Sequence, residues 1–208
     1  MNSNYLCLAI ITLGTLLSTG CAEKKDTGDK VEDAIKEYNF VLENEPLYAR
    51  VYNNRGIAWA RMGFSMRAIK DLKRSNEIEP DYVDPVITLG EIYREQGKYD
   101  DSLITYNQAL KIAPDSIRGL MHRSLVYQNM GEYDKAEADL NHVLKLDVNY
   151  PDAYYGLGML YYELGDHQRA LDDFNRYLEL APNPATEVID MAQMLQEELA
   201  TPEPTPKR

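Results

Sequence analysis

Side chains capable of catalysis occur throughout this 208-residue sequence, but they lack the spacing that a reaction requires. The histidines are His122, His142 and His167. Their separation fits no metal-binding motif, and neighbouring acids such as Asp100–Asp101 and Asp172–Asp173 belong to the polar sides of amphipathic segments. No nucleophile elbow, phosphate-binding loop, dinucleotide-binding glycine pattern or paired-histidine zinc motif is present. We therefore expect no enzyme, no metal and no cofactor; a weak hydrolase built on the acidic faces is the alternative from another class.

Cys21 offers a different chemistry, because a cysteine thiolate is a good nucleophile. The small residues Ser18–Gly20 connect it to an apolar run of 12 residues, Leu6–Leu17, which is too short to span a bilayer as a helix. A run of this length is typical of a secretory signal core. Cys7, the other cysteine, lies inside the run, so a processed chain would have no second thiol and no disulfide framework.

The stretch Leu17–Cys21, LSTGC, resembles the lipobox of bacterial lipoproteins. The resemblance implies that residues 1–20 are a signal peptide and that Cys21 becomes the first mature residue and carries a diacylglycerol. It also implies a lipid anchor in the bacterial cell envelope, with the outer membrane facing the periplasm favoured. Ser18 departs from the leucine that is commonest there, and Met1–Tyr5 lacks Lys and Arg. An ordinary secretory peptide and an uncleaved signal anchor are the alternatives.

The elements that would position a functional side chain recur every 34 residues. Residues 151–184 show the unit most clearly, with apolar or aromatic residues at helical spacing on both sides of Gly165. These residues are Tyr154, Leu157, Tyr161 and Leu164, followed by Ala170, Leu171, Phe174, Leu178 and Leu180. The turn glycine recurs as Gly63, Gly97, Gly131 and Gly165, each 34 residues from the next. The unit is therefore predicted to be helix, glycine turn, helix.

Other positions repeat with the same period. A small residue recurs in the first helix, as Gly56, Gly90, Ser124 and Gly158. One turn later an aromatic residue recurs, as Trp59, Tyr93, Tyr127 and Tyr161. In the second helix another small residue recurs, as Ala68, Ser102, Ala136 and Ala170. Pro46, Pro80, Pro114 and Pro182 close the units, with Val148 as the exception. This pattern resembles the tetratricopeptide repeat family. Repeats one and three depart from it, because Arg55 and Arg123 replace an apolar residue and Leu72 and Leu140 replace an aromatic one.

The resemblance implies an all-α fold: a right-handed superhelical solenoid of antiparallel helix pairs, whose first helices line a concave groove that binds peptides or partner proteins. We expect repeats at 49–82, 83–116, 117–150 and 151–184, preceded by a flexible tether at 21–30 and a half-repeat helix at 31–48 that caps the stack or docks elsewhere. A capping helix at 185–200 and a disordered tail at 201–208 would follow. The alternative for 185–200 is a partner-binding or dimerising helix that displays Met191 and Met194.

The net charge of −12 excludes nucleic acid and an anionic lipid surface as the main ligand. The one candidate basic patch lies in repeat one and consists of Arg50, Arg55, Arg61, Arg67, Lys70, Lys73 and Arg74. Aromatic and basic residues do not alternate here as they do in nucleic-acid-binding proteins. We therefore expect a protein or peptide partner.

The family resemblance also implies which first-helix side chains face the groove. The candidates are Arg50, Asn53, Asn54, Ile57, Arg61, Thr88, Glu91, Arg118, His122, Asn129, Tyr155, Met159 and Tyr162. Asn53, Ile57 and Thr88 stand where chaperone-binding members hold a Lys and Asn clamp, so recognition of a chaperone C-terminus is disfavoured. Asn54 is expected to bind a peptide backbone, and Arg118 and His122 to attract an acidic group.

Together these features predict a membrane-anchored scaffold or adaptor for protein–protein interaction in the bacterial envelope. The alternatives within this class are a periplasmic chaperone or assembly factor for exported, pilus or outer-membrane proteins, and a noncovalent subunit of a peptidoglycan-enzyme complex.

Overall fold

The computed structural model describes residues 24–200, and this part of the chain contains ten helices and no strand. The helices are α2 (Lys24–Asn44), α3 (Ala49–Arg61), α4 (Ser65–Ile78), α5 (Val83–Glu95), α6 (Tyr99–Ile112), α7 (Ile117–Asn129), α8 (Tyr133–Leu146), α9 (Pro151–Glu163), α10 (His167–Leu180) and α11 (Thr186–Ala200). The all-α prediction is confirmed. None of these helices is long and apolar enough to cross a membrane. The lipobox, Cys21 and the tail 201–208 lie outside the described residues.

Each 34-residue unit folds as a pair of packed helices around a glycine turn. The four turn glycines have φ values between +71° and +80°, a region that residues with a Cβ enter only with strain. At Gly165, for example, φ is +75° and the chain passes from α9 into α10. The glycine period seen in the sequence is thus a backbone requirement of the turn.

The small residue in the first helix allows close contact with a large residue in the second. A Cβ added at Gly158 would lie 2.5 Å from the ring of Phe174, which is fully buried. A Cβ at Gly90 would lie 2.8 Å from the buried Tyr106 ring. The two helices of a pair therefore approach more closely than they could with alanine at these positions.

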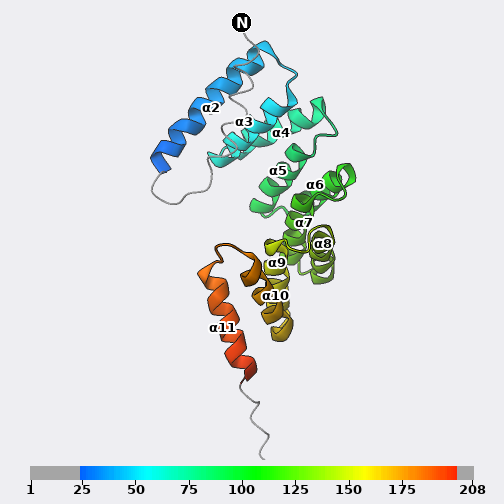
Figure 1. The fold of residues 1–208 in the computed structure, drawn as a ribbon. Helices are drawn as coiled ribbons and strands as arrows, with labels where there is room; N and C mark the ends of the chain where they lie inside the picture. The colour runs from blue at the N-terminus through cyan, green and yellow to red at the C-terminus, as the bar shows by residue number, and fades with distance from the viewer. Residues whose placement is uncertain (1–23, 201–208) are drawn as a thin grey trace, which may run out of the picture.

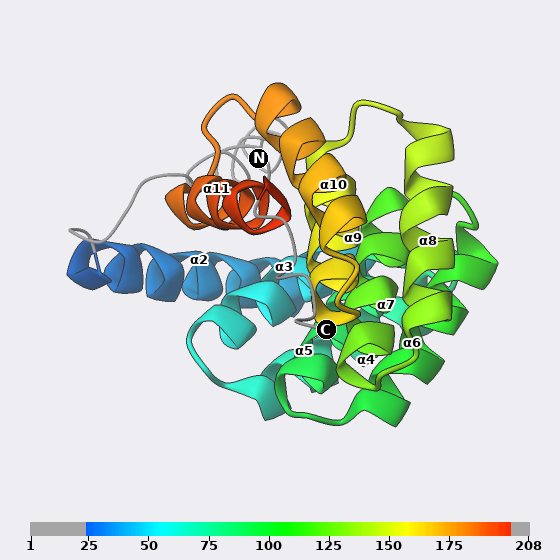
Figure 2. The same cartoon turned by 90° about the horizontal axis from the view of Figure 1, so that it is seen from below.

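The stack curves, and the first helices lie on its inner side. Within the described part of the chain, consecutive first helices, α3 with α5, α5 with α7 and α7 with α9, contact each other. Consecutive second helices do not, so the second helices are spread farther apart. Figure 1 shows the resulting curve, in which α2 and α11 project to the same side at opposite ends. In Figure 2, α6 and α8 lie on the side opposite to α2 and α11.

The N-terminal helix α2 is longer than the sequence predicted. It begins at Lys24, so residues 24–30, which we expected to be part of a flexible tether, are helical. The buried residues Ala34, Ile35, Tyr38 and Leu42 hold the following turns of α2, which packs against α3. Extending an existing helix by two turns needs no new nucleation, and this explains why a polar segment without apolar anchors continues it.

At the other end of the stack, α11 packs against α10. Val188, Ala192 and Leu195 are buried there, and Met191 also packs against this core. Met194 is exposed. The helix therefore covers the apolar side of α10, as a capping helix does, and leaves one of the two methionines available.

Arg55 and Arg123, the arginines that depart from the family pattern in repeats one and three, make the same contacts. Arg55 forms a bidentate hydrogen bond with Asp71, from Nε to Oδ2 at 2.7 Å and from Nη2 to Oδ1 at 2.8 Å. Its Nη1 donates to Asn39 Oδ1 on α2 at 2.8 Å. The same three contacts recur 68 residues later around Arg123, where Asp139 and Asn107 are the partners. The arginine that replaces an apolar residue is thus satisfied by residues of two neighbouring second helices.

Candidate partner-binding surface

The inner face of the stack is formed by α3, α5, α7 and α9, which carry all the groove candidates. The structure does not bring these candidates into one continuous set. It gathers some into a polar cluster between α5 and α7 and others into an aromatic cluster at α9, and it buries Asn53 in a contact between repeats.

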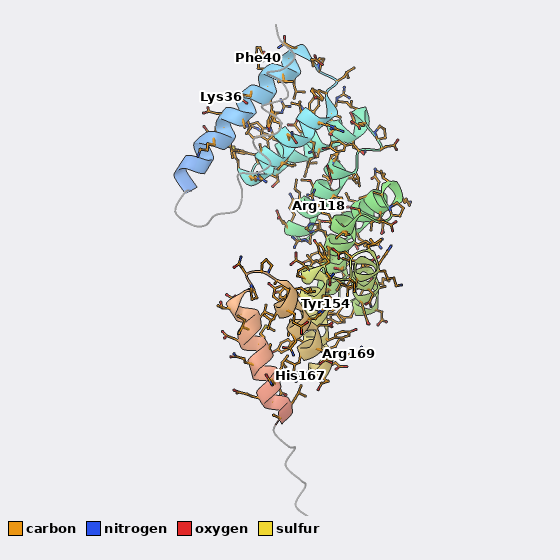
Figure 3. All side chains as sticks on the ribbon, in the orientation of Figure 1. Lys36, Phe40, Arg118, Tyr154, His167 and Arg169 are labelled. Carbon is orange, nitrogen blue, oxygen red and sulfur yellow. The ribbon has the colours of Figure 1, made fainter. Side chains whose placement is uncertain are left out.

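The inner polar cluster consists of Thr88 and Glu91 on α5 with Arg118 and His122 on α7. Arg118 donates from Nε and Nη2 to Glu91 Oε1 at 3.2 and 2.8 Å, and from Nη2 to Thr88 Oγ1 at 3.3 Å. His122 Nε2 lies 3.0 Å from the same Glu91 oxygen. Asp84, at an inward-facing position of α5, also lies 3.8 Å from Arg118. Figure 3 labels Arg118 in the middle of the stack.

Charge within this cluster is already balanced. Burial tends to raise the pKa of Glu91, but the hydrogen bond from His122 and the positive charge of Arg118 outweigh burial and hold the pKa below its usual value. Glu91 is therefore ionised at neutral pH and neutralises Arg118. The expectation that Arg118 and His122 attract an acidic group of a ligand changes accordingly, because an acid of the chain itself occupies that role.

In repeat one, the candidates near the start of α3 contact Tyr82. The Arg50 guanidinium lies 5.8 Å from the centre of the Tyr82 ring, and Asn53 Nδ2 donates to the Tyr82 hydroxyl at 3.2 Å. Burial raises the pKa of Tyr82 to about 12, so this hydroxyl stays neutral. Asn53 is only 3% exposed and donates as well to Asn54 Oδ1 at 3.3 Å. It therefore serves packing between repeats rather than an open binding position.

The remaining members of the predicted set differ in exposure. Ile57 is half-buried, and Arg61 and Asn129 are exposed at the ends of their helices. Asn129 donates to the Leu125 carbonyl of its own helix at 2.7 Å. These residues contribute edges of the inner face and do not join either cluster.

The inner aromatic cluster is centred on Tyr155, which is 40% exposed. Its ring centre lies 5.7 Å from that of Tyr177 and 6.5 Å from that of Phe174, both on α10. Tyr162, one turn beyond Met159, stacks on His167 at 5.9 Å. Met159 and Tyr162 are half-buried against the core shared with α11. Tyr177 and His167 were not in the predicted set, because they lie on a second helix.

His167 connects this cluster to the capping helix. Its Nδ1 lies 3.0 Å from Glu198 Oε1 on α11. Figure 3 labels His167 and Arg169 near the start of α10, and two residues of a helix separated by one position point in nearly opposite directions. His167 is therefore on the α11 side of α10, and Arg169 is on the other.

Two family models match the repeats. Residues 90–131 match a model described as TPR repeat, and residues 123–184 match a model described as Tetratricopeptide repeat. The chain contains tetratricopeptide repeats. The two matches cover part of the chain, and the same helix-turn-helix unit in α3 and α4 precedes them.

Solved structures share this fold over most of the chain. TTC0263, a thermophilic tetratricopeptide repeat protein in Thermus thermophilus, has 23% sequence identity and a TM-score of 0.67, covering 95% of this chain and 98% of that one. PilW, described as a widely conserved type IV pilus biogenesis factor, has 16% identity and a TM-score of 0.73, covering 86% and 82%. A MamA fragment from Desulfovibrio magneticus RS-1 has 18% identity and a TM-score of 0.65, covering 75% and 92%. Identities this low show the fold alone.

Among characterised proteins, the tetratricopeptide segment is similar to the Hsp70-Hsp90 organizing protein of Triticum aestivum. The two are 29% identical over 82 residues, which is 39% of this chain and 14% of that protein. A similar match, 27% identical over 82 residues, is found in Hsp70-Hsp90 organizing protein 3 of Arabidopsis thaliana. The matched segment thus spans about one seventh of these relatives.

Proposed function

We propose that this protein is an interaction scaffold or adaptor that binds a partner protein or peptide on its inner face and is held at a membrane of the bacterial envelope through Cys21. The observation that carries the binding proposal is the exposure of Tyr155 beside Tyr177 on the inner face. Tyrosine is enriched among the few interface residues whose truncation costs the most binding free energy.

Recognition of a chaperone C-terminus is not part of the proposal, although the Hsp70-Hsp90 organizing proteins are relatives. Two of the three clamp positions are engaged internally, since Asn53 contacts Tyr82 and Thr88 accepts a hydrogen bond from Arg118. The third is Ile57, which offers no donor to a carboxylate. A ligand with an apolar or aromatic anchor fits the inner face better than a bare carboxylate.

The anchoring proposal rests on the lipobox resemblance. Because α2 begins at Lys24, two residues separate it from Cys21. A diacylglycerol at Cys21 would therefore hold the start of α2 close to the lipid surface. Cys21→Ser is expected to move the protein from the membrane to the soluble fraction of cells. Retention of the variant in the membrane fraction after a carbonate wash would contradict the lipid anchor.

Binding is tested by crosslinking in cells followed by identification of the captured proteins. We compare the wild-type chain with the double variant Tyr155→Ala, Tyr162→Ala, and expect loss of one defined partner. Phe40→Ala is the matched control, because Phe40 is 67% exposed and lies on the outer side of α2 in Figure 3. A partner that is retained by the inner-face variant and lost from the control would move the interface to the outer side.

A chaperone or assembly factor is the second candidate. The same capture distinguishes it from a scaffold, because a chaperone yields many substoichiometric exported clients and a scaffold yields one partner in a fixed ratio.

A further inference from the structure

A hollow of about 550 Å³ opens on the outer side of repeat one, between the second helices α2 and α4. Trp59 of α3 lies in it, with Arg67 and Lys70 of α4. We call it the outer pocket. None of the groove candidates on the inner face lines it.

Positive charge in the outer pocket exceeds negative charge, and the excess resides on two side chains. Both acids in the lining have a partner: Asp71 is bound by Arg55, and Glu77 lies 2.9 Å from Arg74. Among residues 30–200, whose side chains the structure describes, no carboxylate lies within ion-pair distance of Arg67 or Lys70. The pocket therefore presents two cations whose charge these residues do not neutralise.

The Arg67 guanidinium is held in place by two aromatic rings. Its central carbon lies 4.7 Å from the centre of the Trp59 ring and 5.1 Å from that of Phe64. The two rings themselves meet edge to face at 5.6 Å. Stacking uses the flat side of a guanidinium and leaves the N–H groups at its edge free to bind a carboxylate with two hydrogen bonds. Arg67 is exposed, so this edge is accessible to a ligand.

In the other repeats that have a cation at the register of Arg67, the cation is paired with an acid. At the register of Arg67, Lys135 lies 5.4 Å from the Tyr127 ring and is paired with Glu132. One repeat later, Arg169 lies 4.1 Å from the Tyr161 ring and is paired with Asp166 at 2.6 Å. The pairing acid stands three residues before the cation in both cases.

In repeat one the position of that acid is occupied by Phe64. Repeat two reverses the two charges, with Lys98 at the acid position and Asp101 at the cation position. Repeat one is thus the one repeat of the four with a cation at this register and no opposite charge at its partner position.

Repeat one as a whole also carries more basic than acidic residues. Repeat one, residues 49–82, has seven Lys and Arg against four Asp and Glu, although the whole chain has a net charge of −12. In contrast, residues 31–48 have one basic and five acidic residues. An extended polyanion such as duplex nucleic acid or an anionic bilayer would meet this acidic neighbour, whereas a short peptide segment fits within the pocket alone.

We propose that the outer pocket binds an acidic peptide segment of a partner protein, with the edge of Arg67 holding an Asp or Glu carboxylate, Lys70 adding a second charge and Trp59 packing against the peptide. This site is separate from the inner face, so either surface can bind without the other. The pair of surfaces would let one chain hold two partners.

Trp59 is the one tryptophan of the sequence, so tryptophan fluorescence of the full-length chain reports directly on this pocket. The probe is a short peptide of alternating glutamate and glycine, compared with the same peptide carrying glutamine. We expect saturable binding of the glutamate peptide and at least about a tenfold loss of affinity in Arg67→Gln, since one charge-assisted bidentate contact is removed.

Phe64→Asp provides the sharper variant, because it installs the acid that repeat four already has. Phe64 is 46% exposed and makes no side-chain cap at the start of α4, whereas Asp166 accepts a hydrogen bond from Arg169 N at the start of α10. We expect Phe64→Asp to keep or raise the melting temperature and to reduce peptide affinity about tenfold or more, by neutralising Arg67 from within the chain.

Arg169→Gln, at the paired register of repeat four, and Tyr155→Ala, on the inner face, are the matched controls and should bind the glutamate peptide as the wild type does. The proposal is overturned by absence of binding, by equal binding of the glutamine peptide, or by unchanged affinity in Phe64→Asp. It is equally overturned if a DNA oligonucleotide or phosphatidylglycerol vesicles compete through Arg67 more strongly than the peptide does. If the outer pocket binds the glutamate peptide but the inner-face variant loses no partner, the outer-pocket proposal is supported and the proposed function of the inner face is contradicted.

Discussion

Arg123 binds Asp139 through two nearly parallel hydrogen bonds, from Nε to Oδ2 at 2.7 Å and from Nη2 to Oδ1 at 2.6 Å. The side chains are 21% and 8% exposed, so the pair lies largely out of water. The third donor of Arg123 reaches Asn107 on α6 at 2.8 Å. A single side chain of α7 thus ties together α6 and α8, and Arg55 does the same for α2 and α4.

Removing one member of this pair should be costly. Arg123→Leu leaves the Asp139 carboxylate buried without its partner, and we expect the free energy of unfolding to fall by about 3 kcal/mol. The double variant Arg123→Leu, Asp139→Thr reproduces the residues of repeat two, Leu89 and Thr105, and should recover most of this loss. Urea unfolding of the wild type, both single variants and the double variant measures the coupling. Additive losses would show that the two side chains act independently.

Asp173 occupies the register of Asp71 and Asp139, but Leu157 stands where the arginine would be. Burial and the nearby charges of Asp172 and Glu137 raise its pKa to about 6, against the opposing effect of Arg169. A raised pKa means that the folded state binds the proton more tightly. The stabilising contribution of that proton is complete below about pH 4, the ordinary pKa of Asp, and is lost as the pH rises through about 6.

Asp173→Asn should therefore stabilise the protein at neutral pH. We expect a gain of about 1 kcal/mol at about pH 7, after allowing for solvent around this half-buried group. The gain should disappear near about pH 4, where the wild-type carboxyl is protonated. Melting curves at both pH values test this, with Asp190→Asn at an exposed acid of α11 as the control. An equal gain at both pH values would point to packing rather than ionisation.

Glu91 shows the opposite linkage, because its pKa is lowered by His122 and Arg118 in spite of burial. A depressed pKa contributes stability that is present above the ordinary Glu pKa of about 4.3 and is lost as the pH falls through the lower folded value. Glu91→Gln should cost about 1–2 kcal/mol at about pH 7. The unfolding curves of variant and wild type should converge on acidification below about pH 4. A difference that persists there would contradict an ionic origin.

Two glycines of repeat four should respond differently to alanine. Gly158→Ala places a Cβ 2.5 Å from the fully buried Phe174 ring, and the forced shift should cost about 2–3 kcal/mol. Gly165→Ala meets no atom within 4 Å, but φ is +75°, and this strain alone should cost about 1 kcal/mol. Phe174→Leu has a packing cost of its own, so each glycine variant is also measured in that background. There Gly158→Ala should cost much less than in the wild type, and Gly165→Ala should cost the same. Equal losses that do not respond to Phe174→Leu would rule out the contact as the cause.

Much of the fold was predictable because the repeat is defined by patterns of residues close together in the sequence. A 34-residue period of turn glycines, small residues and apolar stripes predicts helix pairs and the all-α class, and the helices lie where those stripes place them. The start of α2 was wrong by seven residues, since the helix begins at Lys24 and not at Val31. Packing of Ala34 and Tyr38 further along the helix sustains its polar first turns.

The candidate surfaces were less predictable. The sequence identified Tyr155, Arg118 and His122 as inner-face residues through the family pattern, but not that Glu91 neutralises the two basic ones. It identified the basic residues of repeat one, but not that, among the side chains the structure describes, Arg55 and Arg74 of the outer pocket have an acidic partner and Arg67 and Lys70 have none.

The sequence by itself thus determined the repeat, its turns and the class of fold, since each depends on residues a few positions apart along one helix. The tertiary structure decided which charges pair, because Arg55 and Asp71 are 16 residues apart and Arg118 and Glu91 are 27 apart, on different helices. Whether such side chains meet depends on how closely the helices stack and how the stack curves. That geometry results from the summed packing of small and large residues across all repeats. The Arg67 charge is the opposite case: in repeats three and four the equivalent cation is paired by an acid three residues before it, and in repeat one that position is Phe64, so the sequence alone decides this difference.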